Sequence, residues 1–158
     1  MRFLTFIPAL FALPTIGALI DKQYAHLIVP LNKSEEYTPM GTQKSFDIER
    51  YIWTAFLFDV PDNNANWCNL KLTISTDEKR SAPYKVWGNT GDEDFYVFNV
   101  STVSRHINKD ADTWHDHPEI KEWVATFTVW KDGRVKQDGG LFFACAKNNI
   151  AEYIAHPA

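Results

Sequence analysis

The alternation of apolar and polar residues along this chain predicts short β-strands separated by turns. In residues 69–75, two leucines and an isoleucine alternate with polar residues, the period of two that a strand with one buried face requires. Other runs rich in apolar, β-branched and aromatic residues span residues 24–31, 46–60, 84–87, 95–100, 123–130, 141–145 and 150–154. Seven to eight short strands predict an all-β fold, an antiparallel β-sandwich or flattened barrel.

Turn-forming residues separate these runs. Asp132 and Gly133 stand between two β-prone runs and predict a tight hairpin, with positive φ at both turn positions. Further turn signals lie at residues 61–64, 88–91 and 138–140. At most one short helix is expected, at residues 118–122, where the proline would occupy the first turn.

The N-terminus has the layout of a secretory signal peptide. Met1 and Arg2 give a positive start, residues 3–13 are almost wholly apolar, and a proline and a small residue precede the expected cut after residue 18. The apolar run is too short to span a bilayer. We therefore expect residues 1–18 to be removed and the mature chain to be secreted and extracellular.

The rest of the chain predicts one domain with a mildly acidic surface. Residues 19–44 are interrupted by prolines and polar residues, and we expect them to form an N-terminal segment leading into a single β domain at 45–158. The formal net charge is −4, which argues against a nucleic-acid partner, because phosphates require a basic surface. No second apolar segment is long enough for a membrane anchor.

The two cysteines of the chain fall on the inward faces of predicted strands. Cys68 has the parity of the leucines in residues 69–75, and Cys145 shares a face with Leu141 and Phe143. In an oxidising compartment such a pair predicts one disulfide, and two buried free thiols are the alternative. The bond would stabilise the fold by roughly 4 to 5 kcal/mol in the chain-entropy model.

The densest polar stretch, residues 106–119, is a candidate metal site. On a strand, His115 and His117 would place both imidazoles on one face, an arrangement typical of Zn or Cu ligands. A further ligand would come from the same stretch: His106, Asp110, Asp112 or Asp116. The alternative interpretation is a solvated acidic loop that holds no metal.

Groups for nucleophilic catalysis do not assemble in the sequence. There is no Gly-x-Ser-x-Gly motif, and a disulfide would consume both thiols. Ser101 and Ser104 lie near His106 only by the proximity expected of common residues. We therefore expect a protein that is not an enzyme and needs no cofactor, with a metal-dependent enzyme using residues 106–119 as the alternative.

Tryptophans and two sequons raise the question of carbohydrate. Trp67 and Trp114 lie in polar surroundings and are the expected exposed platforms for a glycan. Trp53, Trp123 and Trp130 lie in strand patterns and are expected in the core or in cross-strand pairs.

The sequons are Asn-Lys-Ser at Asn32 and Asn-Val-Ser at Asn99, and Asn32 is the more favoured site because it lies in the N-terminal segment. If Asn99 carries a glycan, its face of the strand is wet. Tyr96, Phe98 and Val100 must then supply the inward side.

Residues near both ends of the domain are similar to one protein family. The stretch Phe-Asp-Val-Pro at 58–61, a turn, and Cys-Asn-Leu at 68–70 resemble the Phe-Asp-Ile/Val-Pro, turn, Cys-x-Leu pattern of fungal But2 C-terminal domains. The closing residues 142–146, followed by Tyr153, are similar to the second cysteine of that family and the strand after it. The similarity touches both ends of residues 45–155.

The resemblance implies a secreted, mostly β fungal domain with no established active site. The link of the family to ubiquitin-like modifiers concerns intracellular proteins, and the export leader argues against it here. We therefore expect a non-catalytic extracellular protein that acts by surface contact, at the fungal cell wall or, as an effector, with a host molecule. Its partner would be an unknown protein or a cell-wall polysaccharide; a glycan-binding module and a metal-binding protein are the alternatives.

Overall fold

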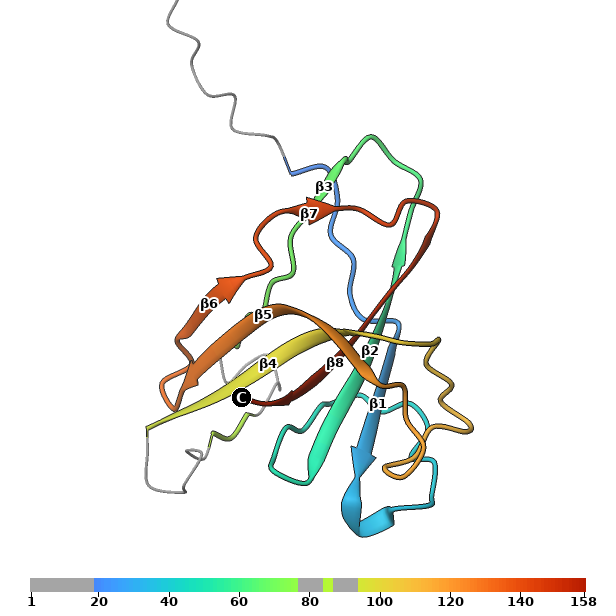
Figure 1. The fold of residues 1–158 in the computed structure, drawn as a ribbon. Coiled ribbons are helices and arrows are strands. Elements are labelled where there is room, and N and C mark those ends of the chain that lie inside the picture. The colour runs from blue at the N-terminus through green and yellow to red at the C-terminus, as the bar shows by residue number, and fades with distance from the viewer. Residues whose placement is uncertain (1–18, 77–83, 87–93) are drawn as a thin grey trace, which may run out of the picture.

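The fold is all-β, as the sequence predicts (Figure 1). The structure is a computed structural model that describes residues 19–76, 84–86 and 94–158. The expected signal peptide and the turn signal at 88–91 lie outside these residues. One short 3₁₀ turn, η1 (Lys33–Glu35), is the only helical element in the described part of the chain. No helix there is long and apolar enough to cross a bilayer.

Six strands form the main antiparallel sheet, and two very short strands form a second one. In spatial order the main sheet contains β1 (Leu27–Asn32), β2 (Ile52–Val60), β8 (Asn149–Pro157), β4 (Phe95–Val103), β5 (Ile120–Trp130) and β6 (Val135–Gly139). The small sheet pairs β3 (Trp67–Cys68) with β7 (Phe143–Ala144). The last strand, β8, lies between β2 and β4, so the main sheet is complete only when the end of the chain is in place.

The N-terminal segment contributes directly to this sheet. β1 pairs with β2 over its whole length, from Leu27 opposite Leu57 to Asn32 opposite Ile52. Val29 and Leu31 are completely buried. The sheet therefore begins within residues 19–44, the segment that the sequence pattern presents as a lead into the domain.

Residues 69–75 do not form a strand, and this prediction is wrong. Their alternation nevertheless reports the correct inward face, because Leu70, Leu72 and Ile74 pack on the buried cluster around Phe98 and Phe127. The segment passes behind β4 and β5 in Figure 1. It crosses the sheet as an extended cover, so it has a buried side without a neighbouring strand to pair with.

Two local predictions also need correction. Residues 118–122 form no helix, because β5 already begins at Ile120. The hairpin between β5 and β6 lies at the predicted Asp-Gly, but only Gly133 has positive φ, at 84°. Trp130 N–H donates to the Arg134 carbonyl, and Gly133 N–H donates to the Trp130 carbonyl. These bonds enclose a three-residue loop instead of the expected two-residue turn.

The two faces of the main sheet are covered differently. One face holds the larger core cluster: Phe98, Val100, Ala125, Phe127, Val129, Tyr153 and Ala155. The other face holds a smaller cluster on the β1–β2–β8 side: Val29, Leu31, Ala55, Ile107 and Ile154. Residues 104–119, here called the covering loop, contribute Ile107 and Trp114 to that smaller cluster. The described residues thus cover the second face over only part of its width.

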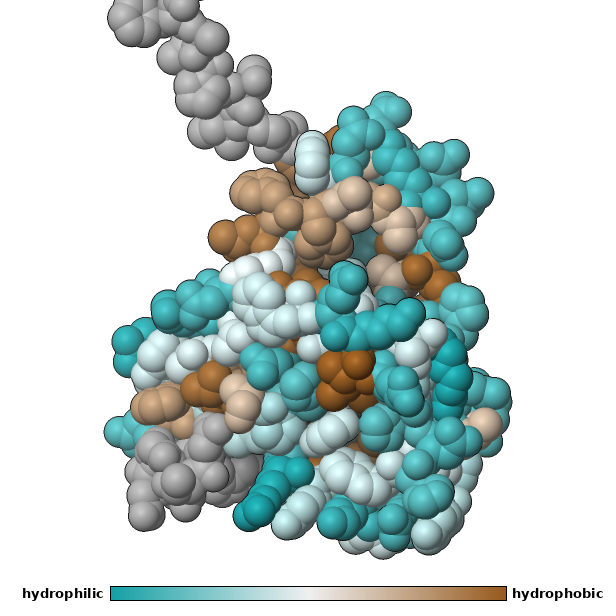
Figure 2. All heavy atoms as spheres, in the orientation of Figure 1, coloured by the Kyte–Doolittle hydropathy of each residue, from teal (hydrophilic) through white to brown (hydrophobic). Residues whose placement is uncertain are grey.

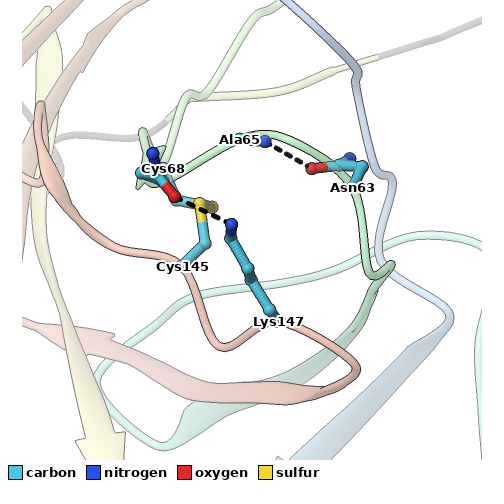
Figure 3. Close-up of a disulfide and its surroundings, with 6 residues drawn as sticks. Asn63, Ala65, Cys68, Cys145 and Lys147 are labelled. Carbon is cyan, nitrogen blue, oxygen red and sulfur yellow. Dashed lines mark hydrogen bonds between the residues drawn. A yellow bond between two sulfur atoms is a disulfide. The ribbon is translucent and has the colours of Figure 1, made fainter.

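The predicted disulfide joins β3 to the residue that directly follows β7 (Figure 3). The Cα atoms of Cys68 and Cys145 are 5.0 Å apart, and the bond bridges a sequence separation of 77 residues. Cys145 N–H donates to the Asn66 carbonyl, and Lys147 Nζ donates to Asn66 Oδ1 at 2.8 Å. Strands of two residues are too short to be stable alone, so the disulfide holds this pair in place.

Replacing both cysteines by alanine should lower the free energy of unfolding by roughly 4 kcal/mol, because the unfolded chain loses its cross-link. Urea unfolding of the oxidised wild type and of the Cys68→Ala/Cys145→Ala variant measures the difference. Wild-type protein reduced with dithiothreitol is the matched control and should have the same free energy of unfolding as the variant. A difference smaller than about 1 kcal/mol would contradict the stabilising role given to the bond.

Candidate binding surfaces

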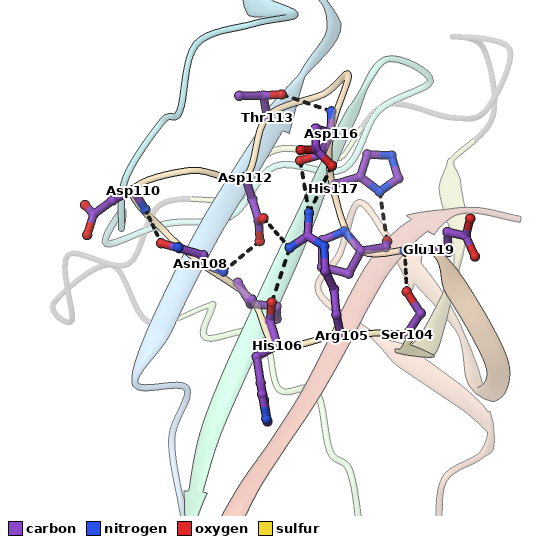
Figure 4. A network of polar contacts seen from close by, with 12 residues as sticks. Ser104, Arg105, His106, Asn108, Asp110, Asp112, Thr113, Asp116, His117 and Glu119 are labelled. Atoms are coloured by element: carbon purple, nitrogen blue, oxygen red, sulfur yellow. Dashed lines mark hydrogen bonds and ion pairs between the residues drawn. The ribbon is translucent and has the colours of Figure 1, made fainter.

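The carboxylates of the covering loop do not assemble the predicted metal site. Asp112 is 1% exposed, and its carboxylate accepts hydrogen bonds from Arg105 Nη1 at 2.6 Å and from Asn108 N–H at 2.7 Å. Asp110 is exposed and pairs with Lys109. Figure 4 shows Asp110 and Asp112 pointing apart, so the two predicted carboxylate ligands belong to separate interactions.

The two histidines of the expected metal site also have separate neighbours. The His115 ring lies 4.9 Å from the Tyr37 ring, between centroids, whereas His117 packs 5.4 Å from Trp53. They diverge because the segment is a loop, and the shared face that a strand would give is lost. Among the described residues, no group of three or more His, Cys, Asp or Glu side chains could hold a metal ion. The fold therefore does not bring the predicted ligands together.

Arg105 holds the covering loop together (Figure 4). Besides Asp112, its guanidinium reaches Asp116, with Nη2 3.2 Å from Oδ1. The hydrogen bond to Asp112 is the main cause that raises the pKa of Arg105 further above its ordinary value. The arginine thus neutralises a carboxylate that the fold has taken out of water, and it ties together residues 105, 112 and 116.

An open hollow of about 420 Å³ lies where the covering loop meets β8. His106 Nδ1 is 2.7 Å from Glu152 Oε2, and Glu152 Oε1 accepts from Ile107 N–H. Ser104 lines the same hollow, but its hydroxyl oxygen accepts from Glu119 N–H. Nucleophilic catalysis needs a serine bonded to its base, and these contacts instead attach the loop to the sheet.

A second serine and histidine face each other inside the sheet. Ser101 Oγ lies 3.2 Å from His156 Nε2, and His156 Nδ1 lies 2.9 Å from the Pro157 carbonyl. Desolvation lowers the pKa of His156 below its ordinary value. Ser101 is only 3% exposed, so a substrate has no direct access to its hydroxyl. The pair acts as a cross-strand contact between β4 and β8.

The tryptophans divide differently from the sequence prediction. Trp67 is 68% exposed, as expected for a surface platform. Trp114 is half-buried and packs edge-to-face on Trp53, with ring centroids 5.0 Å apart, so its predicted exposure is wrong. Trp53 and Trp130 are half-buried on strands, in agreement with the pattern.

Trp123 is a second tryptophan that the sequence prediction misplaces, since it is 56% exposed. β4 and β5 pair with an irregularity here: Val100 lies opposite Ala125, but the next residue, Ser101, lies opposite Trp123. Val124 is therefore an extra residue, a β-bulge that turns Trp123 away from the face of Ala125. Simple alternation cannot indicate such a bulge.

Exposed apolar side chains gather around the small sheet. Trp67 lies opposite Ala144 in the small sheet, and Phe142 lies in the bend directly before β7. Phe142 is 80% exposed and the adjacent Leu141 is 48% exposed. Figure 2 shows brown and tan residues gathered over β3 and β7. We call Trp67, Leu141, Phe142 and Ala144 the aromatic tip.

The sequon residues both lie on strands of the sheet. Asn32 Oδ1 accepts from the N–H and the hydroxyl of Ser34, and Asn99 Oδ1 accepts from the Thr126 hydroxyl. Phe98 and Val100 are buried on the opposite face from Asn99, so the predicted inward side of this strand is confirmed.

One protein family matches most of the chain. The family described as ubiquitin 3 binding protein But2 C-terminal domain matches residues 23–158, a range that contains every strand of the structure. No curated protein and no solved structure matches the chain.

Replacing Arg105 by methionine should lower the free energy of unfolding by roughly 2 to 3 kcal/mol, because the Asp112 carboxylate would stay buried without its cation. Lys109→Met is the matched control. It removes an exposed ion pair of the same loop and should change stability by less than about 0.5 kcal/mol. Urea unfolding compares the two variants, and equal stability would contradict the role of Arg105 as the centre of the loop.

Proposed function

This chain belongs to the But2 C-terminal domain family, and we propose that it is an exported, non-catalytic protein that binds another protein through the aromatic tip. The family description, a ubiquitin 3 binding protein, supports a binding role. The signal-peptide layout of residues 1–18 supports a site of action outside the cytosol, at the fungal cell wall or on a host surface.

The aromatic tip is the observation that carries this proposal. Trp67 on β3 and Phe142 directly before β7 expose two large rings at the small sheet. Contiguous exposed apolar surface is uncommon on soluble proteins and marks interaction sites. Tryptophan is among the residues that contribute most to binding energy at protein interfaces.

The disulfide makes these rings suitable for recognition. Trp67 is bonded to Cys68 along the chain, and Phe142 lies three residues before Cys145, so the cross-link fixes both ring-bearing backbones. A surface that is already ordered loses little conformational entropy when a partner binds. The small sheet therefore serves to present the tip.

The surroundings of Trp67 favour a protein over a polysaccharide as the partner. Across the small sheet Trp67 lies opposite Ala144, and Leu141 and Phe142 directly precede β7; none of these three side chains offers a hydrogen bond. A sugar needs polar groups around the ring that it stacks on, because its hydroxyls must exchange their bonds with water for new ones. An apolar protein surface has no such requirement.

Replacing the two exposed rings should strongly weaken partner binding. We expect Trp67→Ser/Phe142→Ser to weaken retention on intact fungal cell walls or on immobilised ubiquitin by about thirtyfold or more, because each ring acts as an anchor of the interface. Tyr24→Ser/Tyr37→Ser is the matched control, since these rings are 83% and 70% exposed outside the tip. Retention is measured by depletion of labelled protein.

Two results would contradict the proposal: wild-type protein retained on neither support, or tip and control variants retained equally. Protease treatment of the walls should abolish retention on them. Undiminished retention on the stripped polysaccharide would instead assign the tip to the wall glycan.

A further inference from the structure

A second surface with a different composition lies across β4, β5 and β6. Asn99 of β4 lies opposite Thr126 of β5, which lies opposite Asp138 of β6. The bulge adds Trp123 to the same face, opposite Ser101. Figure 2 shows mainly pale and teal residues over the front of these strands, with a few brown and tan ones among them. We call Asn99, Trp123, Thr126, Lys136 and Asp138 the open face.

The Trp123 ring packs against the backbone of β6 at Gly139. A Cβ at Gly139 would meet Cη2 of this ring at 2.5 Å and Cζ2 at 3.0 Å, so only glycine allows the ring to lie there. Its Nε1 donates to Thr126 Oγ1 at 2.9 Å. One side of the ring is therefore used by the protein, while the side chain stays 56% exposed.

The same hydroxyl connects the ring to Asn99. Thr126 Oγ1 donates to Asn99 Oδ1 at 2.6 Å, so a single hydroxyl separates the indole from the amide. Since Asn99 Oδ1 accepts this hydrogen bond, the remaining polar atom of the side chain is the amide nitrogen, Nδ2. That nitrogen is the atom to which an N-glycan is attached, and Asn99 begins the sequon Asn-Val-Ser.

The charges of the open face are compensated. Lys136 Nζ and Asp138 Oδ2 are 2.9 Å apart, next to the threonines of β5. The face therefore combines an exposed ring with neutral hydroxyl and amide groups and one closed ion pair. This composition suits an uncharged polyol, which can stack its C–H groups on the ring and exchange hydrogen bonds with the polar groups around it.

We infer that Asn99 carries an N-linked glycan whose first sugars lie on the Trp123 ring. This inference rests on the export in the proposed function. The donor is a lipid-diphosphate-linked oligosaccharide: Asn99 Nδ2 forms a bond to C1 of its N-acetylglucosamine, the C1–oxygen bond to the diphosphate breaks, and the amide gives up one proton. The lipid diphosphate leaves. The glycan then covers the part of the sheet that the covering loop leaves open.

Asn32 provides the internal comparison. Its amide oxygen is bonded to Ser34 at the start of η1, and no tryptophan shares that contact. A glycan there would extend into solvent. The inference therefore predicts different behaviour for the two sequons of the same chain.

The test uses the full chain secreted from yeast, and the same chain with residues 1–18 replaced by a yeast secretion leader. Amidase release of N-glycans converts each modified asparagine to aspartate, and peptide mass mapping should find this change at Asn99. Acrylamide quenching of tryptophan fluorescence should then increase on glycan release in wild type, in Asn32→Gln and in Trp67→Ala. The increase should be lost in Trp123→Ala and in Asn99→Gln.

Unmodified Asn99 in secreted protein would overturn the inference. This holds even if the unmodified protein binds free chitobiose, because the Trp123 ring would then bind an external sugar and not an attached glycan. Modified Asn99 with no change in quenching on release would overturn it as well. If only the chain with the yeast leader is secreted, the export in the proposed function fails, while the glycan inference is still tested.

Discussion

The bond between Cys68 and Cys145 is the constraint on which the proposed binding surface depends. It links β3 to the residue directly after β7, and these two strands of two residues each form too few ladder hydrogen bonds to be stable alone. Its position close to Trp67 and Phe142 explains how two large rings can stay ordered while more than half exposed. Without the cross-link, the ends of β3 and β7 would be free to collapse onto apolar surface or fray.

In the rest of the molecule, segments without regular secondary structure pack against the two faces of the main sheet. An extended segment carrying Leu70, Leu72 and Ile74 covers one face, and the covering loop covers part of the other. The loop can close over the sheet because Arg105 neutralises the buried Asp112. The two surfaces that the described residues leave uncovered, the aromatic tip and the open face, differ in composition, and this difference separates a protein-binding role from a glycan-bearing one.

The sequence predicts the fold class and the disulfide, because both follow from local patterns. Alternation indicates which positions of a strand face inward, and both cysteines occupy such positions. It fails where spatial context decides. Residues 69–75 have the alternation of a strand, but alternation indicates only which side chains are buried. It does not indicate whether a neighbouring strand is present to form the hydrogen bonds. His115 and His117 diverge because their segment is a loop held by Arg105. The exposure of Trp123 depends on one extra residue in β5, a register effect that alternation hides.

The central claim is that the oxidised tip is the contact surface. The most direct measurement places a photo-cross-linking phenylalanine analogue at residue 142, or at residue 24 as the control, and illuminates the labelled protein on fungal cell walls. The account predicts a discrete adduct from residue 142 alone, lost when the protein is reduced beforehand. Equal adducts from both positions, or an adduct at residue 142 that survives reduction, would contradict it.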